Sequence, residues 1–330
     1  MTFETLIAHN KRTSLGLVLA MIVLITALGG VFSYALGSLG NTHDYAYLIR
    51  LGAIVGAIFA IVGSLFSYYA GGWIIANISD ARAVEHYEDP VLFNVVQEMA
   101  IAAGIPPPKI YAIAHPAPNA FATGRDPEHA IIGITTGLRK MLDRDELQAV
   151  IAHEMAHIKN YDTRLMMLVG VYAGIIVLMS DYFIRIFLDS FRLSGRRRAR
   201  SSAHTKSNGP LLIFCIILAI ILAMVAPLIA RLMRLAVSRE REYLADATAV
   251  QLCRNPVALA SALEKLGTDK TEESSFANRA TEHMFIVNPD PKLRIKSVNK
   301  DSIWSTHPPL IRRIARIKKL AGEYIEGTNQ

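Results

Sequence analysis

The sequence predicts a mostly helical α+β protein in which a water-soluble domain is combined with about four transmembrane or membrane-embedded helices. Three observations lead to this fold class. The 330 residues are 52% hydrophobic and only 19% charged, whereas soluble domains carry about 25% charged residues. The apolar residues gather in four blocks. The polar segments between the blocks are long enough to build a core of their own, so we expect one part of the chain in lipid and another in water.

The first two blocks predict a pair of transmembrane helices in residues 1–80. No charged residue occurs between Arg12 and Asp44, and a second charge-free stretch covers Leu51–Ile78. Each exceeds the roughly 20 apolar residues that cross a bilayer. The first block is too long for the apolar region of a signal peptide, and a second block follows at once. The basic residues before the first block predict a cytoplasmic N-terminus by the positive-inside rule.

The third and fourth blocks predict a membrane hairpin in residues 165–230. Block three, Leu165–Ser180, is short for a span and could instead be a buried core helix, while block four runs from about Pro210 to Ala230. The loop between them, residues 189–210, is basic, so placing it outside the membrane conflicts with the positive-inside rule. Three resolutions stay open: a hairpin that does not cross fully, an orientation dominated by the earlier helices, or an inverted topology.

Residues 81–164 and 231–330 predict the two parts of the water-soluble domain. The first part has an amphipathic helix at Asp89–Ala103, ended by glycine and prolines. A long helix is expected from about Asp143 to Lys159, with an N-cap and a glutamate three residues on. The remaining elements are three short strands and a C-terminal basic helix, at Lys109–Ala114, Ala120–Thr123, Ala130–Thr135 and Leu310–Leu320.

The long helix carries an H-E-x-x-H motif. His153 and His157 are four residues apart, so both imidazoles leave the same helical face and can bind one metal ion. Zinc with three protein ligands keeps a fourth position for water and lowers the pKa of that water to about 7. Glu154 can take the proton of the water as it attacks a peptide carbonyl, and then pass it to the leaving amine. A chance match has a probability of roughly one in a hundred by composition, and the apolar neighbours Ala152 and Ala156 indicate a buried helix rather than one bearing surface histidines.

The third metal ligand is expected in a second helix, which begins just after block four. Glu242 and Asp246 are four residues apart there, so one carboxylate can bind zinc while the other holds a ligand histidine. From spacing alone, Glu240 is a rival for the role of third ligand. The alternative to a metal site is that these charged residues form a solvated face of the helix. Two cysteines in the whole chain cannot build a cysteine-rich zinc site.

Four motifs in this order resemble the HtpX-type membrane zinc metalloproteases, which are related to the CAAX prenyl endopeptidases. In chain order, the motifs are Asn119–Gly124, His153–His157, Glu242–Asp246 and Ser305–Leu310. The resemblance implies a zincin-type metalloprotease domain with Glu242 as the third zinc ligand and Asp246 supporting a ligand histidine. It also implies that Asn119 contacts the substrate backbone. With Ala120 and Phe121, Asn119 would form an edge strand to which an unfolded peptide adds through main-chain hydrogen bonds.

Two residues near the C-terminus complete the candidate site. The resemblance implies that His307 stabilises the oxyanion, and the alternative is a turn residue held before two prolines. Arg313 could be a second electrophile that contacts the substrate, or a partner for a carboxylate. The acidic residues that often follow the H-P-P-L segment in this family are replaced here by Ile311 and Arg312.

The sequence thus predicts an endopeptidase with one Zn²⁺ per chain, in a bacterial-type inner membrane. The resemblance implies a multi-pass protein with its active site facing the cytoplasm, which cuts misfolded or damaged membrane proteins. One alternative is a CAAX-type prenyl endopeptidase, which is disfavoured because those enzymes usually have more spans. Another is a catalytically silent scaffold with structural zinc, against which the presence of Glu154 argues. No nucleic-acid partner is expected, because no aromatic platform accompanies the basic loop.

Overall fold

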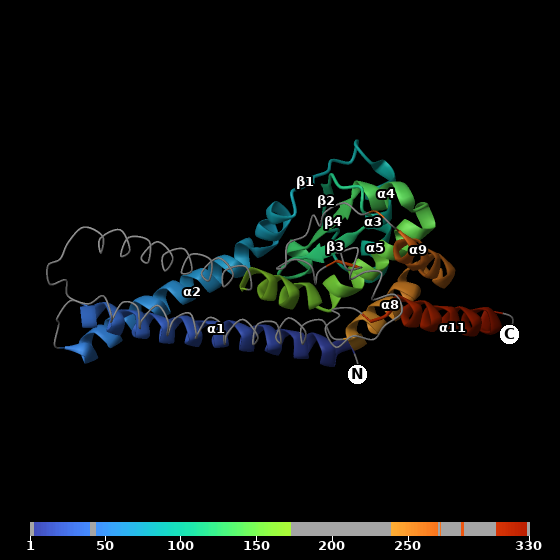
Figure 1. Ribbon diagram of the computed structural model, residues 1–330. Coiled ribbons are helices and arrows are strands. Elements are labelled where there is room, and N and C mark those ends of the chain that lie inside the picture. The colour runs from blue at the N-terminus through green and yellow to red at the C-terminus, as the bar shows by residue number, and fades with distance from the viewer. Residues whose placement is uncertain are drawn as a thin grey trace, which may run out of the picture. The chain divides into compact units, whose positions relative to one another are not determined.

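Two long apolar helices form the N-terminal part of the chain in the computed structural model (Figure 1). Helix α1 spans Phe3–Leu39 and helix α2 spans Tyr45–Ile78. Both are long and apolar enough to cross a membrane, α1 through Ile7–Ala27 and α2 over its whole length. These helices contain the first two apolar blocks of the sequence. The structure describes residues 3–39, 44–172, 239–269, 271, 285–286 and 308–328.

The surface of α2 agrees with a lipid environment. Its large apolar side chains Ile58, Phe59 and Phe66 are all more than half exposed, at 58%, 67% and 58%, and such a stripe would be costly in water. The two helices approach each other where glycines meet, since a Cβ atom on Gly29 would lie 2.4 Å from the carbonyl oxygen of Gly52. Small residues at such crossings let the backbones of membrane helices pack closely.

The described residues divide into two compact units. Unit 1 takes its residues from Met1–Ser14, Tyr68–Val171 and Met233–Gln330, and unit 2 from Leu15–Ser67 and Tyr172–Leu232. The first turns of α1 therefore belong to the same unit as the H-E-x-x-H helix. Residues 162–172 are helical and mostly buried, whereas the rest of block three, the basic loop and block four lie outside the described residues. The predicted membrane hairpin therefore stays a prediction.

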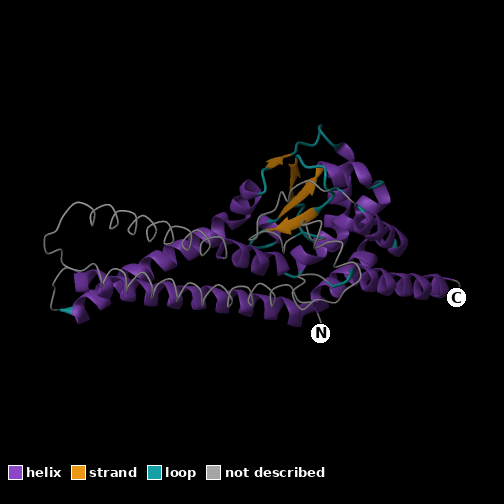
Figure 2. Cartoon of the chain, in the orientation of Figure 1, coloured by secondary structure: helices purple, strands orange, loops and turns teal. Residues whose placement is uncertain are grey.

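Unit 1 contains one four-stranded sheet in the order β1-β2-β4-β3, which is drawn in orange in Figure 2. The strands are β1 (Ala81–Ala83), β2 (Lys109–Ile113), β3 (Ala120–Thr123) and β4 (Ile131–Thr135). Strands β2 and β4 are parallel, while β1 and β3 are antiparallel to their neighbours. Strand β3 lies at one edge of the sheet, as the sequence predicts.

Capping residues in the local sequence determine where helices α3 and α5 of unit 1 begin and where α3 ends. Asp89 caps α3 (Pro90–Ala103), and Gly104 ends it with a φ of 68°, in the left-handed region that glycine favours. Helix α5 (Arg144–Lys159) begins with a capping box between Asp143 and Glu146. Further α-helices among the described residues are α4, α8, α9 and α11, at Thr136–Met141, Arg239–Cys253, Pro256–Thr268 and Leu310–Thr328.

The sequence prediction and the structure agree on three strands and on the helices at α3, α5, α8 and α11. Strand β1, helix α4 and helix α9 were not predicted. Helix α11 continues past the predicted end at Leu320 to Thr328. Glu146 shows why α9 matters, because its buried carboxylate accepts hydrogen bonds from Ser261 at 2.7 Å and from Lys265 at 2.6 Å, both on α9.

Candidate metal centre

Helix α5 carries the two histidines through the middle of the hydrophobic core. Every residue from Glu146 to Ile158 except Gln148 is buried. The helix contacts strand β3 and helices α3, α8 and α9. A helix covered on so many sides cannot have histidines on a solvated face, so the surface alternative raised by the sequence does not apply. His153 and His157 are 1% and 4% exposed.

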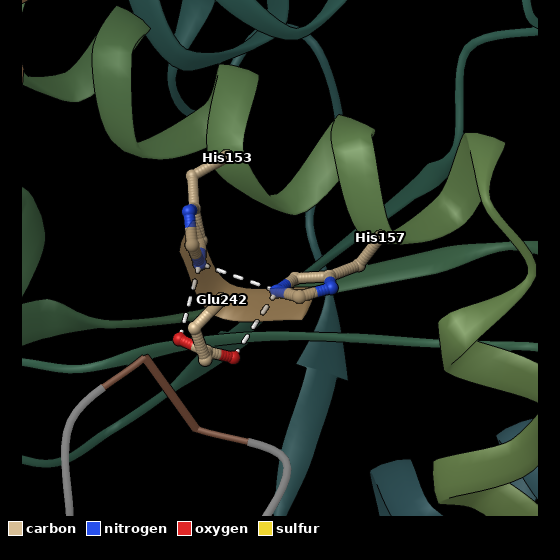
Figure 3. Close-up of side chains that lie close together, drawn as sticks. All are labelled: His153, His157 and Glu242. Carbon is tan, nitrogen blue, oxygen red and sulfur yellow. Dashed lines mark hydrogen bonds and ion pairs between the residues drawn. The ribbon is translucent and has the colours of Figure 1, made fainter. Parts of the chain in front are cut away.

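The two imidazoles meet a carboxylate from α8 (Figure 3). The Nε2 atoms of His153 and His157 lie 3.2 Å apart. Glu242 brings Oε1 to 3.5 Å from Nε2 of His157 and Oε2 to 3.8 Å from Nε2 of His153. One ligand atom from each residue lies within 4.8 Å of the other two, so the three residues could hold a metal ion.

The spacing of these atoms suits zinc. With bonds of about 2.0–2.1 Å to nitrogen and oxygen and tetrahedral angles, neighbouring zinc ligands lie about 3.3 Å apart. The observed separations of 3.2, 3.5 and 3.8 Å are close to that value. The rival ligand Glu240 is exposed, whereas Glu242 is buried beside the histidines. The structure therefore favours Glu242 over Glu240.

A carboxylate lies behind each histidine. The Nδ1 atom of His153 is 3.1 Å from Oδ1 of Asp246, and the Nδ1 atom of His157 is 3.0 Å from Oδ2 of Asp162. Such contacts fix the orientation of the ring and leave Nε2 to face the metal. Asp246 is where the sequence predicted it. Asp162 was missed, because a turn at Tyr161 with a φ of 61° interrupts the helical spacing on which the prediction depended.

Arg313 is completely buried against the carboxylates. Its Nε and Nη2 atoms donate to the two oxygens of Asp246 at 2.8 and 2.7 Å, and Nη1 lies 3.2 Å from Oε2 of Glu242. This is the geometry of a carboxylate partner, the second of the two roles that the sequence left open. Burial alone would raise the pKa of Asp246, but the charge of Arg313 and the contact with His153 outweigh it and lower this pKa.

Glu154 lies between the two histidines in sequence and is 2% exposed. Burial raises the pKa of its carboxyl to about 7, although the charges of His157 and Arg313 and the backbone of Ala122 favour the ionised form. A carboxyl with a pKa near neutrality can both accept and return a proton at physiological pH. Glu154 therefore has the electrostatic setting of a general base.

Asn119 immediately precedes strand β3, whose first two residues are Ala120 and Phe121. All three residues are buried, so a substrate could meet this strand only along its backbone edge. That edge is paired within the chain, because Phe121 forms an antiparallel bridge with Phe285 and the N–H of Ile286 donates to the carbonyl of Ala120 at 2.9 Å. His307 lies outside the described residues, so its predicted role is not addressed by the structure.

Comparison with known proteins assigns the family. A model described as Peptidase family M48 matches residues 87–321. The chain belongs to this family. Proteins named Protease HtpX homolog are similar over most of its length. The one from Caldanaerobacter subterraneus subsp. tengcongensis is 41% identical over 82% of this chain and 85% of its own, and the one from Dictyoglomus turgidum is 39% identical over 97% and 95%.

Further similarities extend to an archaeon and to a solved structure. A Protease HtpX homolog of Pyrococcus furiosus is 40% identical over 82% of this chain and 88% of its own. The crystal structure of Ste24p from S. mikatae matches with a TM-score of 0.45 and 20% identity, over 95% of this chain and 66% of that one. The proteins named Protease HtpX homolog confirm the resemblance to the HtpX-type proteases that the four motifs indicate.

Proposed function

We propose that this member of the M48 family is a membrane-integrated zinc endopeptidase that hydrolyses peptide bonds of misfolded or damaged membrane proteins. The observation that carries the proposal is the buried trio of His153, His157 and Glu242, whose ligand atoms lie within 4.8 Å of one another, with Glu154 beside it. The names of the relatives and the family description support protease activity. Glu154 is not one of the three candidate ligands, and a structural metal site needs no general base beside it, so its presence favours catalysis over a structural metal site.

The three residues would hold zinc through Nε2 of His153, Nε2 of His157 and the carboxylate of Glu242. Two imidazoles and one carboxylate are a ligand set of catalytic zinc sites that leave a position for water. Bound there, zinc would polarise a peptide carbonyl and lower the pKa of a water molecule. Asp162 and Asp246 would keep the rings in place, and Arg313 would balance the charge of the carboxylates.

Glu154 would transfer a proton from the attacking water to the leaving amine. In its ionised form it accepts the proton of the attacking water, and it then donates this proton to the nitrogen of the leaving amine. The water-poor surroundings that raise its pKa to about 7 also make the return of the proton possible at neutral pH. His307 is proposed to stabilise the negative charge that develops on the peptide oxygen, from the segment just before α11.

The substrate would bind as an extended strand along the edge of β3 that Phe285 and Ile286 occupy in the structure. Asn119, Ala120 and Phe121 would contribute main-chain groups, which read backbone geometry rather than sequence. A peptide entering this edge would replace the pairing with Phe285 and Ile286. Binding through the backbone suits an enzyme that removes damaged proteins of varied sequence.

The proposal includes a location and a division into segments. The protein would be multi-pass in the cytoplasmic membrane, with residues 1–80 as the first pair of spans and residues 165–230 as a hairpin inserted between the two parts of the protease domain, 81–164 and 231–330. Lys11 and Arg12, which precede the first charge-free block, support a cytoplasmic N-terminus. The active site, which follows two crossings, would face the same side.

The test is proteolysis by the full chain with and without Glu154. The protein is purified in detergent with a chelator, loaded with zinc and given casein as an unfolded substrate. Glu154→Gln is expected to bind one zinc ion but to lower the cleavage rate by about 10²–10⁴-fold, the range for loss of a general base. Glu264→Gln, which alters an exposed glutamate paired with Lys318, is the matched control and should cleave normally.

Other results would point elsewhere. Equal rates for Glu154→Gln and the unchanged chain would disprove the mechanism. A chain that binds zinc and cleaves nothing would be a silent scaffold. Cleavage restricted to prenylated C-terminal peptides would indicate a CAAX-type prenyl endopeptidase, the alternative function considered from the sequence.

A further inference from the structure

Helix α1 brings a buried amide to the edge of the metal centre. Asn10 is completely buried, although most of the helix around it is exposed. Its Nδ2 atom donates to the carbonyl of Asn160 at 2.9 Å and to Oδ1 of Asp162 at 2.7 Å. These contacts join residues 150 and 152 positions apart in the sequence, and all of them lie within unit 1.

Asp162 connects this amide to a metal-ligand candidate. One of its oxygens accepts from Asn10, and the other lies 3.0 Å from Nδ1 of His157. The remaining cation near this carboxylate, Arg241, lies at 3.8 Å from Oδ1, which is beyond hydrogen-bonding distance. Among the residues described around Asp162, the shortest contact that holds Oδ1 is therefore the one from Asn10.

Asn10 also holds the turn that positions Asp162. Helix α5 ends at Lys159, Asn160 is its C-cap, and Tyr161 has a left-handed φ of 61°, which is uncommon for a residue other than glycine. The bond from Asn10 to the carbonyl of Asn160 fixes this turn from outside. Lys11, the next residue of α1, lies 4.4 Å from the centre of the Tyr161 ring, so two successive residues of α1 contact the same turn.

We infer that Asn10 is a positioning residue of the metal centre, acting through Asp162 on His157. It makes the first turns of the N-terminal apolar helix part of the metal site. Removal of a partner bonded directly to a ligand histidine, here Asp162, typically changes metal affinity by about 10–100-fold, so the loss of Asn10, which acts through Asp162, should have an effect at the lower end of that range. The inference rests on the proposed function only in assuming that His157 binds the metal. It needs no assumption about substrate.

A purely structural role for Asn10 makes a different prediction. Asparagine between apolar helices often serves to dock one helix on another, and its loss then lowers stability without changing the metal ligands. Ser14 offers the matched control, because it is buried one turn further along α1 and its hydroxyl has no hydrogen-bond partner among the described residues. Both side chains sit on the buried stripe of α1, but only Asn10 reaches Asp162.

The experiment measures metal binding in the full chain in detergent, not proteolysis. Metal-free protein carrying Asn10→Ala, Asn10→Asp or Ser14→Ala is titrated with zinc against a chelator, and with cobalt(II) while the visible absorption is recorded. We expect Asn10→Ala to weaken zinc binding by about tenfold, the lower end of the range for a direct partner such as Asp162, and to alter the cobalt spectrum. Asn10→Asp should do at least as much, because it sets an acceptor against the Asp162 carboxylate. Ser14→Ala should match the unchanged chain.

A double-mutant cycle separates positioning from docking. If Asn10 acts through Asp162, then Asn10→Ala should have little further effect on zinc affinity in a chain that already carries Asp162→Asn. If Asn10→Ala fails to fold, Asn10→Ser keeps a shorter donor and takes its place in the cycle.

The inference is overturned if Asn10→Ala, or Asn10→Ser in its place, lowers thermal stability but keeps wild-type zinc affinity and cobalt spectrum. It is also overturned if the effects of the two substitutions simply add. A chain that binds zinc tightly but does not cleave casein would refute the proposed function and leave this inference standing.

Discussion

At the residue scale, two histidines with the same kind of partner have opposite pKa shifts. Burial lowers the pKa of His153, and the contact with Asp246 does not reverse this, because the charge of Arg313 opposes it. Burial acts in the same direction on His157, but Asp162 and the charge of Glu242 outweigh it and raise the pKa to about 9. The difference lies in the neighbours, since Arg313 donates to Asp246 at 2.7 and 2.8 Å, whereas Arg241 lies 3.8 Å from Asp162.

This raised pKa predicts a pH dependence of zinc binding. A histidine binds metal only in its neutral form, so at pH 7 to 8 zinc must displace a proton from His157, whose pKa in the metal-free protein is about 9. The apparent zinc affinity is expected to rise about tenfold from pH 7 to pH 8 and to level off above pH 9. Competition with a chelator of known pH dependence measures it.

Asp162→Asn provides the control for this prediction. Removing the charge that holds the proton should lower the pKa of His157 and flatten the dependence between pH 7 and 8. The stability of the metal-free protein depends on pH in the opposite direction to zinc binding. Folding raises the pKa of His157 from 6.5 to about 9. The protonated histidine therefore stabilises the folded state fully below pH 6.5, and this stabilisation is lost as the pH rises towards 9. A zinc affinity that is constant from pH 7 to 9 would show that His157 is already neutral.

At the scale of elements, strand β3 depends on a glycine in its neighbour. Phe121 on β3 lies opposite Gly133 on β4, and a Cβ atom on Gly133 would lie 1.9 Å from Cε1 of the Phe121 ring. The ring in turn contacts Phe285, with ring centres 5.3 Å apart. The absence of a side chain at residue 133 therefore sets the place of the ring beside the proposed substrate edge.

Gly133→Ala is expected to destabilise unit 1 by about 1–3 kcal/mol, the usual range for an overpacked core. The ring of Phe121 must move away from β4 and disturb the β3 edge, so casein cleavage should fall as well. Thermal unfolding of the purified chain measures the first effect. Gly322→Ala on α11, where a Cβ atom would meet open space, should leave the melting temperature unchanged or slightly higher. An unchanged melting temperature for Gly133→Ala would contradict the packing described here.

At the scale of the whole molecule, the candidate ligands come from two distant parts of the chain. His153 and His157 lie on α5, whereas Glu242 lies on α8, beyond the segment that includes blocks three and four. A metal ion held by all three would tie α5 to α8. Because such a site does not exist in the unfolded chain, the free energy of metal binding adds to the free energy of unfolding.

Removal of zinc should therefore lower the melting temperature, and added zinc should restore it. At a free zinc concentration 100-fold above the dissociation constant, the expected stabilisation is about 2.7 kcal/mol. Glu154→Gln should keep the full zinc-dependent shift, because Glu154 is not a proposed ligand, and Glu242→Ala should lose most of it. Differential scanning fluorimetry in detergent is a suitable measurement. Identical melting curves in chelator and in zinc would argue against a site that joins α5 and α8.

Local patterns predicted much of the fold and the centre of the site. The four-residue spacing of His153 and His157, the glycine that ends α3 and the capping box of α5 are properties of neighbouring residues. Strand β1 and helix α4 are three and six residues long, too short for periodicity to reveal. Glu240 and Glu242 have the same charge and nearly the same sequence environment, so spacing does not distinguish them, whereas the family resemblance and their burial do.

The sequence by itself determined which segments are apolar enough for lipid and which helix face carries the histidines, because both depend on residues within a few turns of one another. The tertiary structure alone brought Asp162 and Asn10 into the site, and it decided that Arg313 pairs with the carboxylates. Their roles depend on burial and on contacts between residues far apart in the chain. In a buried site water is excluded, so polar and charged groups are stable only when they are paired with one another. The H-E-x-x-H motif thus predicts a metal site, whereas the groups that surround the site are determined by the tertiary structure.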